Sequence, residues 1–369
     1  MNTSPALPRP RRGSSAQRGF SLIEVLVGML IAMVGVIIMM EVLLTSEQRT
    51  RTTGTGNDAL SSGAVMLHMM KKDLVQAGYG INSLALLGCN VTLPGHNAVI
   101  PLAPVVINPA VIPAGDANTD RLLVFYGTDP GQPEGNAVFT ASGATYTMQS
   151  PWSFAVGDHV VAIGSNCSGG ASLARVTAVS ALDITVTVAQ AGAEVVYNMG
   201  RNPREVAYAV RNGSLTSCDF MAADCRNLGA HWVSVAGDVV SLRAQYGRDT
   251  APAGSMDGFV DQWTSANPTS SCEWARSPAV RLALVTRSTE FETRIDATTG
   301  QRVRDVVTAA APVWTGGVVS ADNPVARPIV LNQNPNGSAN ADWQAYRYRM
   351  LETVAPTRNV VWMGAQTGC

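Results

Sequence analysis

The stretch RGFSLIEVLVGMLIAMVGVIIMMEVLL, residues 18–44, decides how the rest of this chain is organised. Residues 25–40 contain no charge, and residues 20–44 would form a helix about 37 Å long at 1.5 Å per residue. A helix of that length crosses a bilayer. A secretory signal peptide has a shorter apolar core and a small-residue cleavage site, which is missing after Met40. We therefore predict a transmembrane helix.

The charges on either side of this stretch predict its orientation. The residues before it carry arginines and no acidic residue, whereas the arginines after it are accompanied by glutamates. Basic flanks stay in the cytoplasm, so we expect a cytoplasmic N-terminus and a C-terminal bulk that crosses the membrane. The residues are Arg9, Arg11, Arg12 and Arg18 before the stretch, and Glu41, Glu47, Arg49 and Arg51 after it.

Glu24 lies inside the apolar stretch, one turn beyond Phe20. A carboxylate is costly in hydrocarbon and usually marks a function, although a residue near the membrane edge can also snorkel to the surface. Gly28, Ala32 and Gly35 place small residues on one helical face. Such a face allows close approach of neighbouring helices, or it reflects the ordinary glycine content of membrane helices.

The composition indicates a folded, loop-rich β protein beyond the helix. Of the 369 residues, 46% are apolar, which can supply a sizeable core. Charged residues make up 14%, the formal net charge is -1, and the 34 glycines and 20 prolines follow no fixed period. Because no basic block could contact phosphates, we do not expect nucleic-acid binding.

Motifs of catalysis are missing from the sequence. There is no HExxH, GxSxG, Walker or Rossmann pattern. His231 beside Trp232, and Asp158 with His159, are isolated candidates in strand-like apolar contexts, where a surface or core histidine is the simpler interpretation. We therefore expect no enzyme and no cofactor, with a membrane-anchored periplasmic enzyme as the weaker alternative.

Six cysteines follow the apolar stretch. In an exported domain they would meet an oxidising compartment, so we predict disulfides, although sequence cannot choose among the 15 possible pairings. Cys218 and Cys225 are nearest in sequence and could close a short loop, while Cys272 and Cys369 are candidates to tether the C-terminus. There is no CxxC and the histidines are scattered, so no zinc site is predicted.

Beyond Leu44 the polarity rises, and Gly54 and Gly56 in TRTRTTGTGNDALSS predict an interruption or hinge in the helix. Helical periodicity then resumes in a stripe that should pack on the globular domain. The stripe is Leu60, Ala64, Leu67, Lys71 and Leu74, and the pattern ends at residues 77–80.

From about residue 99 the chain is predicted to form short strands separated by turns. Arg211-Asn212-Gly213-Ser214 is a strong hairpin signal because Asn and Gly tolerate positive φ. Residues 128–155 and 290–340 are rich in Gly, Pro, Asn and Thr and are predicted to be long surface loops. The predicted fold class is α+β, a long N-terminal helix packed on an antiparallel β-sheet domain. The strands are RLLVFYG (121–127), HVVAIGS (159–165), ARVTAV (174–179), DITVTVA (183–189), REVAYAVRNGSLTSC (204–218), DVVSLRAQYG (238–247) and AVRLALVTRS (279–288).

Residues 18–24, RGFSLIE, followed by the apolar run, resemble the cleavage and methylation motif of type IV prepilins and type II secretion pseudopilins. The resemblance implies that a prepilin peptidase and methyltransferase cuts between Gly19 and Phe20 and N-methylates the new Phe20 amine. Glu24 would then be the fifth mature residue. Because amine and carboxylate are both costly in hydrocarbon, Glu24 could pair with its own amine or with that of an adjacent subunit, which would set the register of assembly.

Later segments resemble the PilW family of minor pilins, larger relatives of the J-type pseudopilin of type II secretion. The resemblance implies a minor pilin that primes pilus assembly at the filament tip, together with other minor pilins, the major pilin and the inner-membrane assembly machinery. A J-type pseudopilin is the alternative function. The segments are residues 71–79, 241–247, 281–285, 346–350 and 356–359.

This resemblance also implies a division of the chain. Residues 1–19 would be a cytoplasmic leader that is removed, residues 20–44 the transmembrane helix, residues 45–80 the periplasmic part of the helix, and residues 81–369 a periplasmic β-rich domain. The mature protein would be anchored in the inner membrane before it enters the pilus.

The family often has a loop resembling a calcium site after the segment at 241–247, and here residues 247–263 read GRDTAPAGSMDGFVDQW. Asp249, Asp257 and Asp261 could supply oxygen ligands, with Gly258 making a turn. The usual spacing is absent because TAPAGSM separates the acids, so a loop of Asx turns is the alternative.

Overall fold

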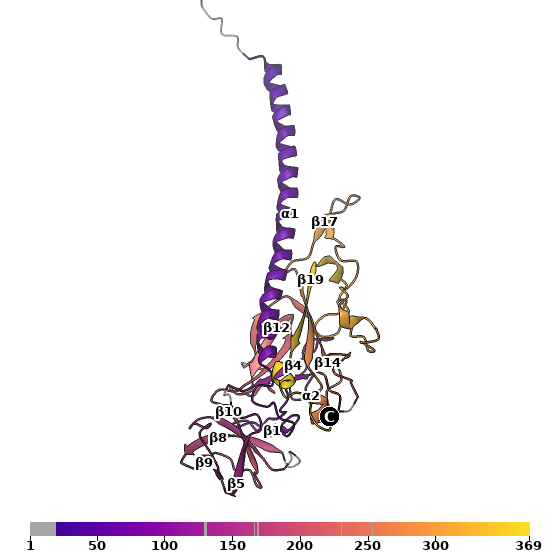
Figure 1. The fold of residues 1–369 in the computed structure, drawn as a ribbon. Helices are drawn as coiled ribbons and strands as arrows, with labels where there is room; N and C mark the ends of the chain where they lie inside the picture. The colour runs from indigo at the N-terminus through magenta and orange to yellow at the C-terminus, as the bar shows by residue number, and fades with distance from the viewer. Residues whose placement is uncertain (1–19, 129–130, 166, 168–169, 230, 253) are drawn as a thin grey trace, which may run out of the picture. The chain divides into compact units, whose positions relative to one another are not determined.

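The computed structural model describes residues 20–128, 131–165, 167, 170–229, 231–252 and 254–369. One long helix, α1 (Leu22–Gln76), is followed by strands that pair almost entirely antiparallel (Figure 1). The α+β class predicted from the sequence is therefore confirmed. The chain divides into two compact units, Met1–Gly54 and Thr55–Cys369, and the boundary falls within α1.

Helix α1 is continuous where the sequence predicted an interruption. Gly54 and Gly56 both lie inside it, so the predicted interruption is wrong, while the hinge stays a prediction. Each glycine costs roughly 1 kcal/mol relative to alanine, which the hydrogen-bonded turns on either side can offset. Gly56 is also buried, and a Cβ there would lie 3.7 Å from the Arg349 guanidinium, so packing supports the helix at this point.

Two antiparallel sheets contribute a large part of the main core of the second unit. One has the strand order β15-β14-β16-β19 and the other the order β13-β12-β11-β4-β3. The predicted hairpin joins β11 to β12, with φ of 50° at Asn212 and 71° at Gly213. The bounds are β3 (Val105–Ile107), β4 (Leu122–Tyr126), β11 (Arg204–Arg211), β12 (Ser214–Asp219), β13 (Val233–Ala236), β14 (Val239–Arg248), β15 (Gln262–Thr264), β16 (Ala279–Arg287) and β19 (Tyr348–Pro356).

The face of α1 that meets this core is shifted by about one position from the predicted stripe. Leu67 and Leu74 are buried as predicted, but Leu60, Ala64 and Lys71 are exposed. Methionine fills irregular gaps and glycine permits close approach, so these residues can form a core face that a search for leucines misses. The buried face consists of Ala59, Gly63, Met66, Leu67, Met70, Leu74 and Ala77.

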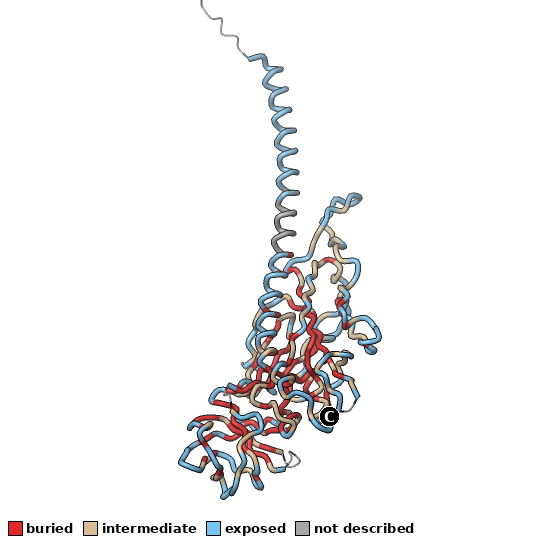
Figure 2. Tube along the Cα trace, in the orientation of Figure 1, coloured by how far each residue is buried: buried red, intermediate tan, exposed pale blue. Residues whose placement is uncertain are grey.

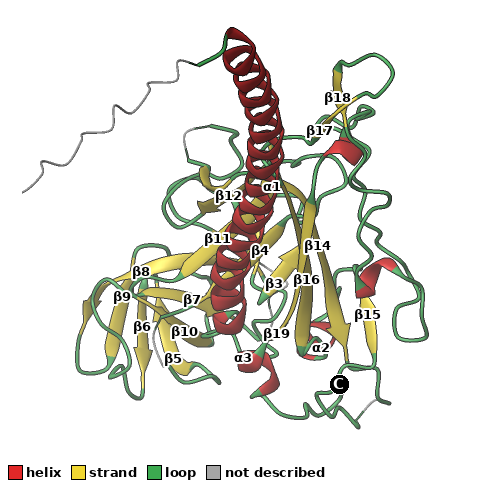
Figure 3. Cartoon of the chain, turned by 90° about the horizontal axis from the view of Figure 1, so that it is seen from above, coloured by secondary structure: helices red, strands yellow, loops and turns green. Residues whose placement is uncertain are grey.

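A small β-barrel is inserted in the sequence between β4 and β11. Its strands pair in the order β7-β10-β5-β6-β9-β8, and β8 also pairs with β7, which closes the ring (Figure 3). The barrel has its own apolar core, which includes Tyr146, Met148 and Ile184. The predicted surface loop at 128–155 is therefore wrong in part, because β5 and β6 lie within it. The bounds are β5 (Asn136–Ser142), β6 (Thr145–Met148), β7 (His159–Ile163), β8 (Ala171–Val179), β9 (Asp183–Val186) and β10 (Val195–Gly200), with β1 (Asn90–Thr92) beside β8 and β2 (Val99–Pro101) beside β1.

Residues 290–340 are mostly irregular, as predicted, but they are more than a surface loop. Trp314, Ile329 and Leu331 form a separate buried cluster with Ala283 and Val285 of β16. Side chains alternate across a strand, so this segment covers the face of the sheet opposite to α1. The remaining elements are α2 (Ser271–Ala275), β17 (Thr293–Ile295), β18 (Arg302–Arg304), η1 (Thr315–Gly317), η2 (Trp343–Ala345) and α3 (Arg358–Val361).

Candidate functional site

The first unit presents an exposed apolar helix. Leu22–Leu43 has a mean hydropathy of 2.7, is long enough to cross a membrane, and is not buried anywhere along its length (Figure 2). Phe20, just before the helix, is 83% exposed. Such a continuous apolar surface is unfavourable in water, so lipid or another protein must cover it.

Glu24 occupies the first turn of α1, where the Ser21 carbonyl accepts hydrogen bonds from the N–H groups of Glu24 (2.9 Å) and Val25 (3.2 Å). A carboxylate is favourable there because the N-terminus of a helix carries partial positive charge. A Cβ added at Gly28 or Gly35 would meet no atom within 4 Å. These glycines are thus not required by packing within the described chain. Gly19 lies outside the described residues, so the predicted cleavage position stays a prediction.

In the second unit α1 lies directly on the sheet. The Thr286 hydroxyl of β16 donates a 2.9 Å hydrogen bond to the Ala59 carbonyl. A Cβ at Gly63 would be only 2.6 Å from Cδ1 of Leu351 in β19 and 3.3 Å from Cγ2 of Thr286. Glycine is therefore what allows the helix backbone to approach these two strands.

The C-terminal end of α1 is held by polar contacts that sequence reasoning missed. The Asp73 carboxylate accepts a hydrogen bond from the Tyr126 hydroxyl at 3.0 Å and another from the Tyr208 hydroxyl. The Asn359 amide donates to the last carbonyls of the helix end, at Gln76 (2.9 Å) and residue 77 (3.1 Å). Two segments that resemble the PilW family, residues 71–79 and 356–359, thus meet at one place.

The tyrosines at this helix end remain hydrogen-bond donors over a wide pH range. Burial, and next the nearby Asp73 carboxylate, raises the pKa of both Tyr126 and Tyr208 well above the ordinary value. An acidic residue near a helix C-terminus is electrostatically unfavourable. That conflict within the sequence KKDLVQ is the signal that could have identified Asp73 as a residue with a tertiary partner.

Two other segments that resemble the family, residues 241–247 and 281–285, lie in β14 and β16. Their side chains also contact the segment 290–340 that covers these strands. The Arg281 guanidinium donates to Oε1 of Gln245 at 2.9 and 2.7 Å and lies 4.5 Å from the ring centroid of Trp263. The same guanidinium also lies 5.4 Å from the ring centroid of Trp314. Burial lowers the pKa of Arg281, but the cation–π contacts compensate part of its lost hydration. The surroundings of Arg281 are therefore filled by side chains of the same protein, and its contacts are structural.

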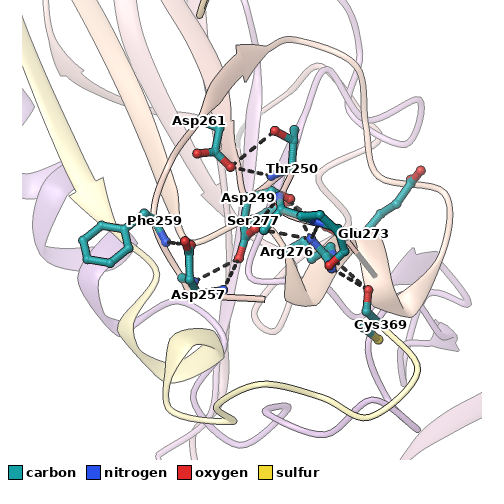
Figure 4. Close-up of polar contacts among 12 residues, drawn as sticks. Asp249, Thr250, Asp257, Phe259, Asp261, Glu273, Arg276, Ser277 and Cys369 are labelled. Atoms are coloured by element: carbon teal, nitrogen blue, oxygen red, sulfur yellow. Dashed lines mark hydrogen bonds and ion pairs between the residues drawn. The ribbon is translucent and has the colours of Figure 1, made fainter. Parts of the chain in front are cut away.

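The carboxylate of Asp249, a predicted calcium ligand, is used by its own loop (Figure 4). Asp249 is buried, and its Oδ2 accepts the N–H groups of Asp257 and Gly258, both at 2.9 Å. Its Oδ1 accepts the Ala251 N–H at 3.0 Å and pairs with Arg276 at 3.3 Å. The guanidinium and the backbone therefore balance the charge that a cation would balance.

The other two predicted ligands also bond locally. Asp257 accepts the N–H of Phe259 at 2.9 Å, and Asp261 accepts the N–H of Thr250 at 2.8 Å (Figure 4). Within the described ranges, no group of three His, Cys, Asp or Glu side chains could hold a metal ion. This geometry favours the loop of Asx turns over a calcium site.

Three disulfides join all six cysteines. Cys218–Cys225 forms as predicted, and Cys272–Cys369 ties the C-terminal segment to α2. The third bond, Cys89–Cys167, links the segment after α1 to the turn between β7 and β8 of the barrel, and the sequence did not predict it.

The isolated polar residues considered for catalysis do not come together. Asp158 accepts the Ala155 N–H at 2.8 Å and the Asn198 amide at 3.1 Å, so it closes a turn of the barrel. Burial lowers the pKa of His159, whose ring contacts the Arg201 carbonyl. His231 lies on the surface elsewhere, beside β13.

Two clefts in the second unit have walls unlike an active site. One of about 500 Å³ is lined by apolar, Asn, Ser and Thr side chains with no titratable group, including Val99, Pro109 and Trp274. The other, of about 380 Å³, contains Asp249 and Glu273, both paired with arginines. Neither cleft offers a nucleophile beside a base.

Comparison with known proteins gives two family matches. Residues 207–359 match the family described as type IV pilus-assembly protein W, and residues 14–40 match the prokaryotic N-terminal methylation motif. No curated protein matches the chain. Among solved structures, the type IV-like pilin TTHA1219 from Thermus thermophilus aligns with 12% identity over 82% of this chain and 97% of its own, with a TM-score of 0.31. A TM-score this low does not establish a common fold.

Proposed function

Because the chain belongs to the PilW family of type IV pilus-assembly proteins, we propose that it is a minor pilin that primes pilus assembly in a tip complex. Its partners in this role are other minor pilins, the major pilin and the inner-membrane assembly machinery. The observation that carries the proposal is the apolar helix Leu22–Leu43, which is wholly exposed and bears Glu24 in its first turn. Such a helix needs lipid or protein around it. The membrane supplies lipid before assembly, and neighbouring subunits supply protein in the pilus.

Processing precedes this role. A prepilin peptidase and methyltransferase would cut between Gly19 and Phe20 and methylate the new amine, which leaves Glu24 as the fifth residue. The arginines before the helix hold the N-terminus in the cytoplasm and direct the second unit to the periplasm. The protein is then a single-pass inner-membrane protein until it is drawn into the pilus.

The proposal makes Glu24 essential for assembly and dispensable for folding. Glu24→Ala should leave the second unit folded and its disulfides intact, while surface pili and twitching fall severalfold. Leu30→Ala, in the same exposed helix, is the matched control and should have little effect. Normal piliation of the Glu24 variant would refute the assembly role.

The processing step is tested separately. Replacing Gly19 with a bulky residue should leave a precursor that migrates more slowly in the membrane fraction. Deletion of the gene distinguishes the pilus from the alternative secretion function, since a minor pilin is needed for twitching and a J-type pseudopilin for exoprotein secretion. Loss of secretion with normal pili would assign the protein to the secretion system.

A further inference from the structure

The sheet β15-β14-β16-β19 ends in a long outer strand. β19 has nine residues and pairs with β16 in an unbroken antiparallel register, from Tyr348 opposite Arg287 to Pro356 opposite Ala279. Native proteins prevent pairing with other chains by keeping outer strands short, and β19 lacks that protection. The other described strands that end a sheet have only three or four residues each, and they are β2, β3, β13, β15, β17 and β18.

Hydrogen bonds at the two ends of β19 determine which of its backbone groups point outward. The Ser288 N–H donates to the Arg347 carbonyl at 2.8 Å, and the Thr357 N–H donates to the Pro278 carbonyl at 2.9 Å. In an antiparallel pair, residues that bond the partner strand alternate with residues whose N–H and C=O face away from it. The odd-numbered residues of β19 therefore bond β16. The residues that face outward with both groups are Tyr348, Met350, Glu352 and Val354.

These outward groups are available for binding. Within the part of the chain that the structure describes, no hydrogen bond joins the backbone of these four residues to another group. Val354 is 51% exposed, and Arg349 and Glu352 are exposed too. Backbone groups of this kind bond either water or another strand. An extended peptide offers its own N–H and C=O groups at the matching spacing.

Two charges of opposite sign flank this edge. The Arg349 side chain lies on the face that α1 covers, near Gly56, and the Glu352 carboxylate lies on the opposite face, where it accepts a 3.0 Å hydrogen bond from the Thr315 hydroxyl. Neither charge forms an ion pair with a described residue. Opposite charges on directly facing residues stabilise a strand pair, and like charges destabilise it. A basic residue opposite Glu352 and an acidic residue opposite Arg349 therefore favour an added strand.

A second copy of β19 does not meet this requirement. The outward groups belong to even-numbered residues, so two antiparallel copies can bond only with even-numbered residues opposite each other. Arg349 of one copy therefore never lies opposite Glu352 of the other. The register that pairs the whole strand places Glu352 opposite Glu352, which is destabilising. The edge thus fits a different sequence better than its own.

We propose that the outer edge of β19 is a docking site for an extended segment of a different subunit, which adds to this sheet as an antiparallel strand. The segment places an apolar residue opposite Val354, a basic residue opposite Glu352 and an acidic residue opposite Arg349, so it reads apolar-x-basic-x-x-acidic. Main-chain hydrogen bonds supply the attachment, and the side chains select the partner. The inference deepens the proposed function and rests on it for the statement that the partner belongs to the same pilus.

A synthetic peptide tests the edge itself. The probe has blocked ends and reads valine-x-lysine-x-x-glutamate, with threonine at each x, and its control exchanges the lysine and the glutamate. Amide hydrogen exchange of the full chain in detergent is followed residue by residue with peptide at millimolar concentration. The probe should slow exchange at Met350, Glu352 and Val354 by about tenfold, as a peptide concentration near ten times its Kd would do. Leu351 and Thr353, which already bond β16, should be unaffected.

A proline variant removes one outward donor without touching the sheet. Val354→Pro deletes an N–H that faces away from β16, and proline is tolerated at such positions of an outer strand. It should weaken binding of the probe by about fivefold, the effect of one main-chain hydrogen bond, and leave the unfolding transition in place. Val354→Thr keeps the N–H and is the matched control. In cells, Val354→Pro should reduce surface pili and Val354→Thr should not.

Exchange of the two charges tests how the partner is selected and needs no proline. In the double variant Arg349→Glu with Glu352→Lys, the preference should reverse, so that the control peptide protects the outward amides and the probe does not. Both side chains are exposed, so the fold should persist. Equal protection by the two peptides in either protein would contradict selection by these charges.

Other results would overturn the inference as well. Unchanged exchange at the outward amides, or slower exchange at Leu351 and Thr353 alone, would mean that no strand adds to β19. A dimer of the unaltered chain that Val354→Pro dissociates would mean that a second copy is the occupant. Normal piliation of Val354→Pro would remove the edge from assembly. Normal piliation after deletion of the gene would instead refute the proposed function, and the peptide experiment would still decide whether β19 accepts a strand.

Discussion

The two halves of α1 share one helical backbone and differ in what covers them. In the first half no part of Leu22–Leu43 is buried, whereas Met66, Met70 and Leu74 in the second half are each 1% exposed. The apolar side chains of the first half are exposed on the described chain. Those of the second half are buried against the chain's own sheets. Equal substitutions in the two halves should therefore have unequal effects on the stability of the second unit.

The sharpest form of this comparison uses one residue type. Met70→Ala opens a cavity at a fully packed position and should lower the free energy of unfolding by about 3 kcal/mol. Met33→Ala changes a side chain that is 69% exposed and should change it by less than about 0.5 kcal/mol. Tryptophan fluorescence during denaturation of the full chain in detergent measures both, because all seven tryptophans lie beyond residue 54. Equal shifts would break the comparison.

A second pair tests glycines. A Cβ at Gly63 would be 2.6 Å from Cδ1 of Leu351, so Gly63→Val should overpack the contact between helix and sheet and cost about 2 kcal/mol. Gly35→Val meets no atom of the described chain and should leave the unfolding transition in place. If the small face serves contact between subunits, Gly35→Val should instead reduce pilus number. An unchanged transition for Gly63→Val would show that the helix is not closely seated on β19.

The same contrast explains what the sequence could and could not predict. The first half is recognisable because its signal is local: an uninterrupted apolar run with a carboxylate near one end needs no knowledge of a partner. In the second half the buried face includes Gly63, Met66 and Met70. Which positions of the helix are buried depends on the shapes of β16 and β19. A search for leucines selected Leu60, which is exposed.

The strands show the same dependence on context. β16 and the hairpin at Asn212 were predictable because a buried apolar run and an Asn-Gly turn are local signals. β5 was missed because NAVFTAS is mostly exposed and is a strand only through pairing in a small barrel that closes through distant contacts. β19, YRMLETVAP, carries charged residues at exposed positions and is a strand because β16 pairs with it along its whole length.

Asp73 tests the polar part of the helix anchor. Asp73→Asn replaces one carboxylate oxygen by an N–H donor, so one of the two tyrosine hydroxyls loses its acceptor in a buried setting. We expect a loss of about 1.5 kcal/mol in the free energy of unfolding. Asp58→Asn, an exposed aspartate on the same helix, is the matched control and should be neutral. In the first half, Glu24→Gln should likewise not shift this transition, and a shift as large as that of Asp73→Asn would contradict the division between the halves.

The smallest expected effect concerns alkaline pH and again belongs to the second half, since residues 20–54 contain no tyrosine. Burial, and then Asp73, raises the pKa of Tyr208 far above 10, the approximate value in an unfolded chain. Above pH 10 the unfolded chain loses a proton that the folded chain keeps, so the folded state loses stability as pH rises. At pH 10.5 this amounts to about 0.8 kcal/mol for one such tyrosine.

Tyr208→Phe removes that contribution together with a hydrogen bond to Asp73. The informative quantity is therefore the change in free energy of unfolding between pH 8 and pH 10.5, in which the lost hydrogen bond largely cancels. This change should be smaller in Tyr208→Phe than in the unaltered chain by about 0.8 kcal/mol. Phe20→Ala in the first half should leave it unaltered. Identical pH sensitivity in Tyr208→Phe and the unaltered chain would mean that Tyr208 ionises equally in both states, and that the helix end is more open to water than its burial indicates.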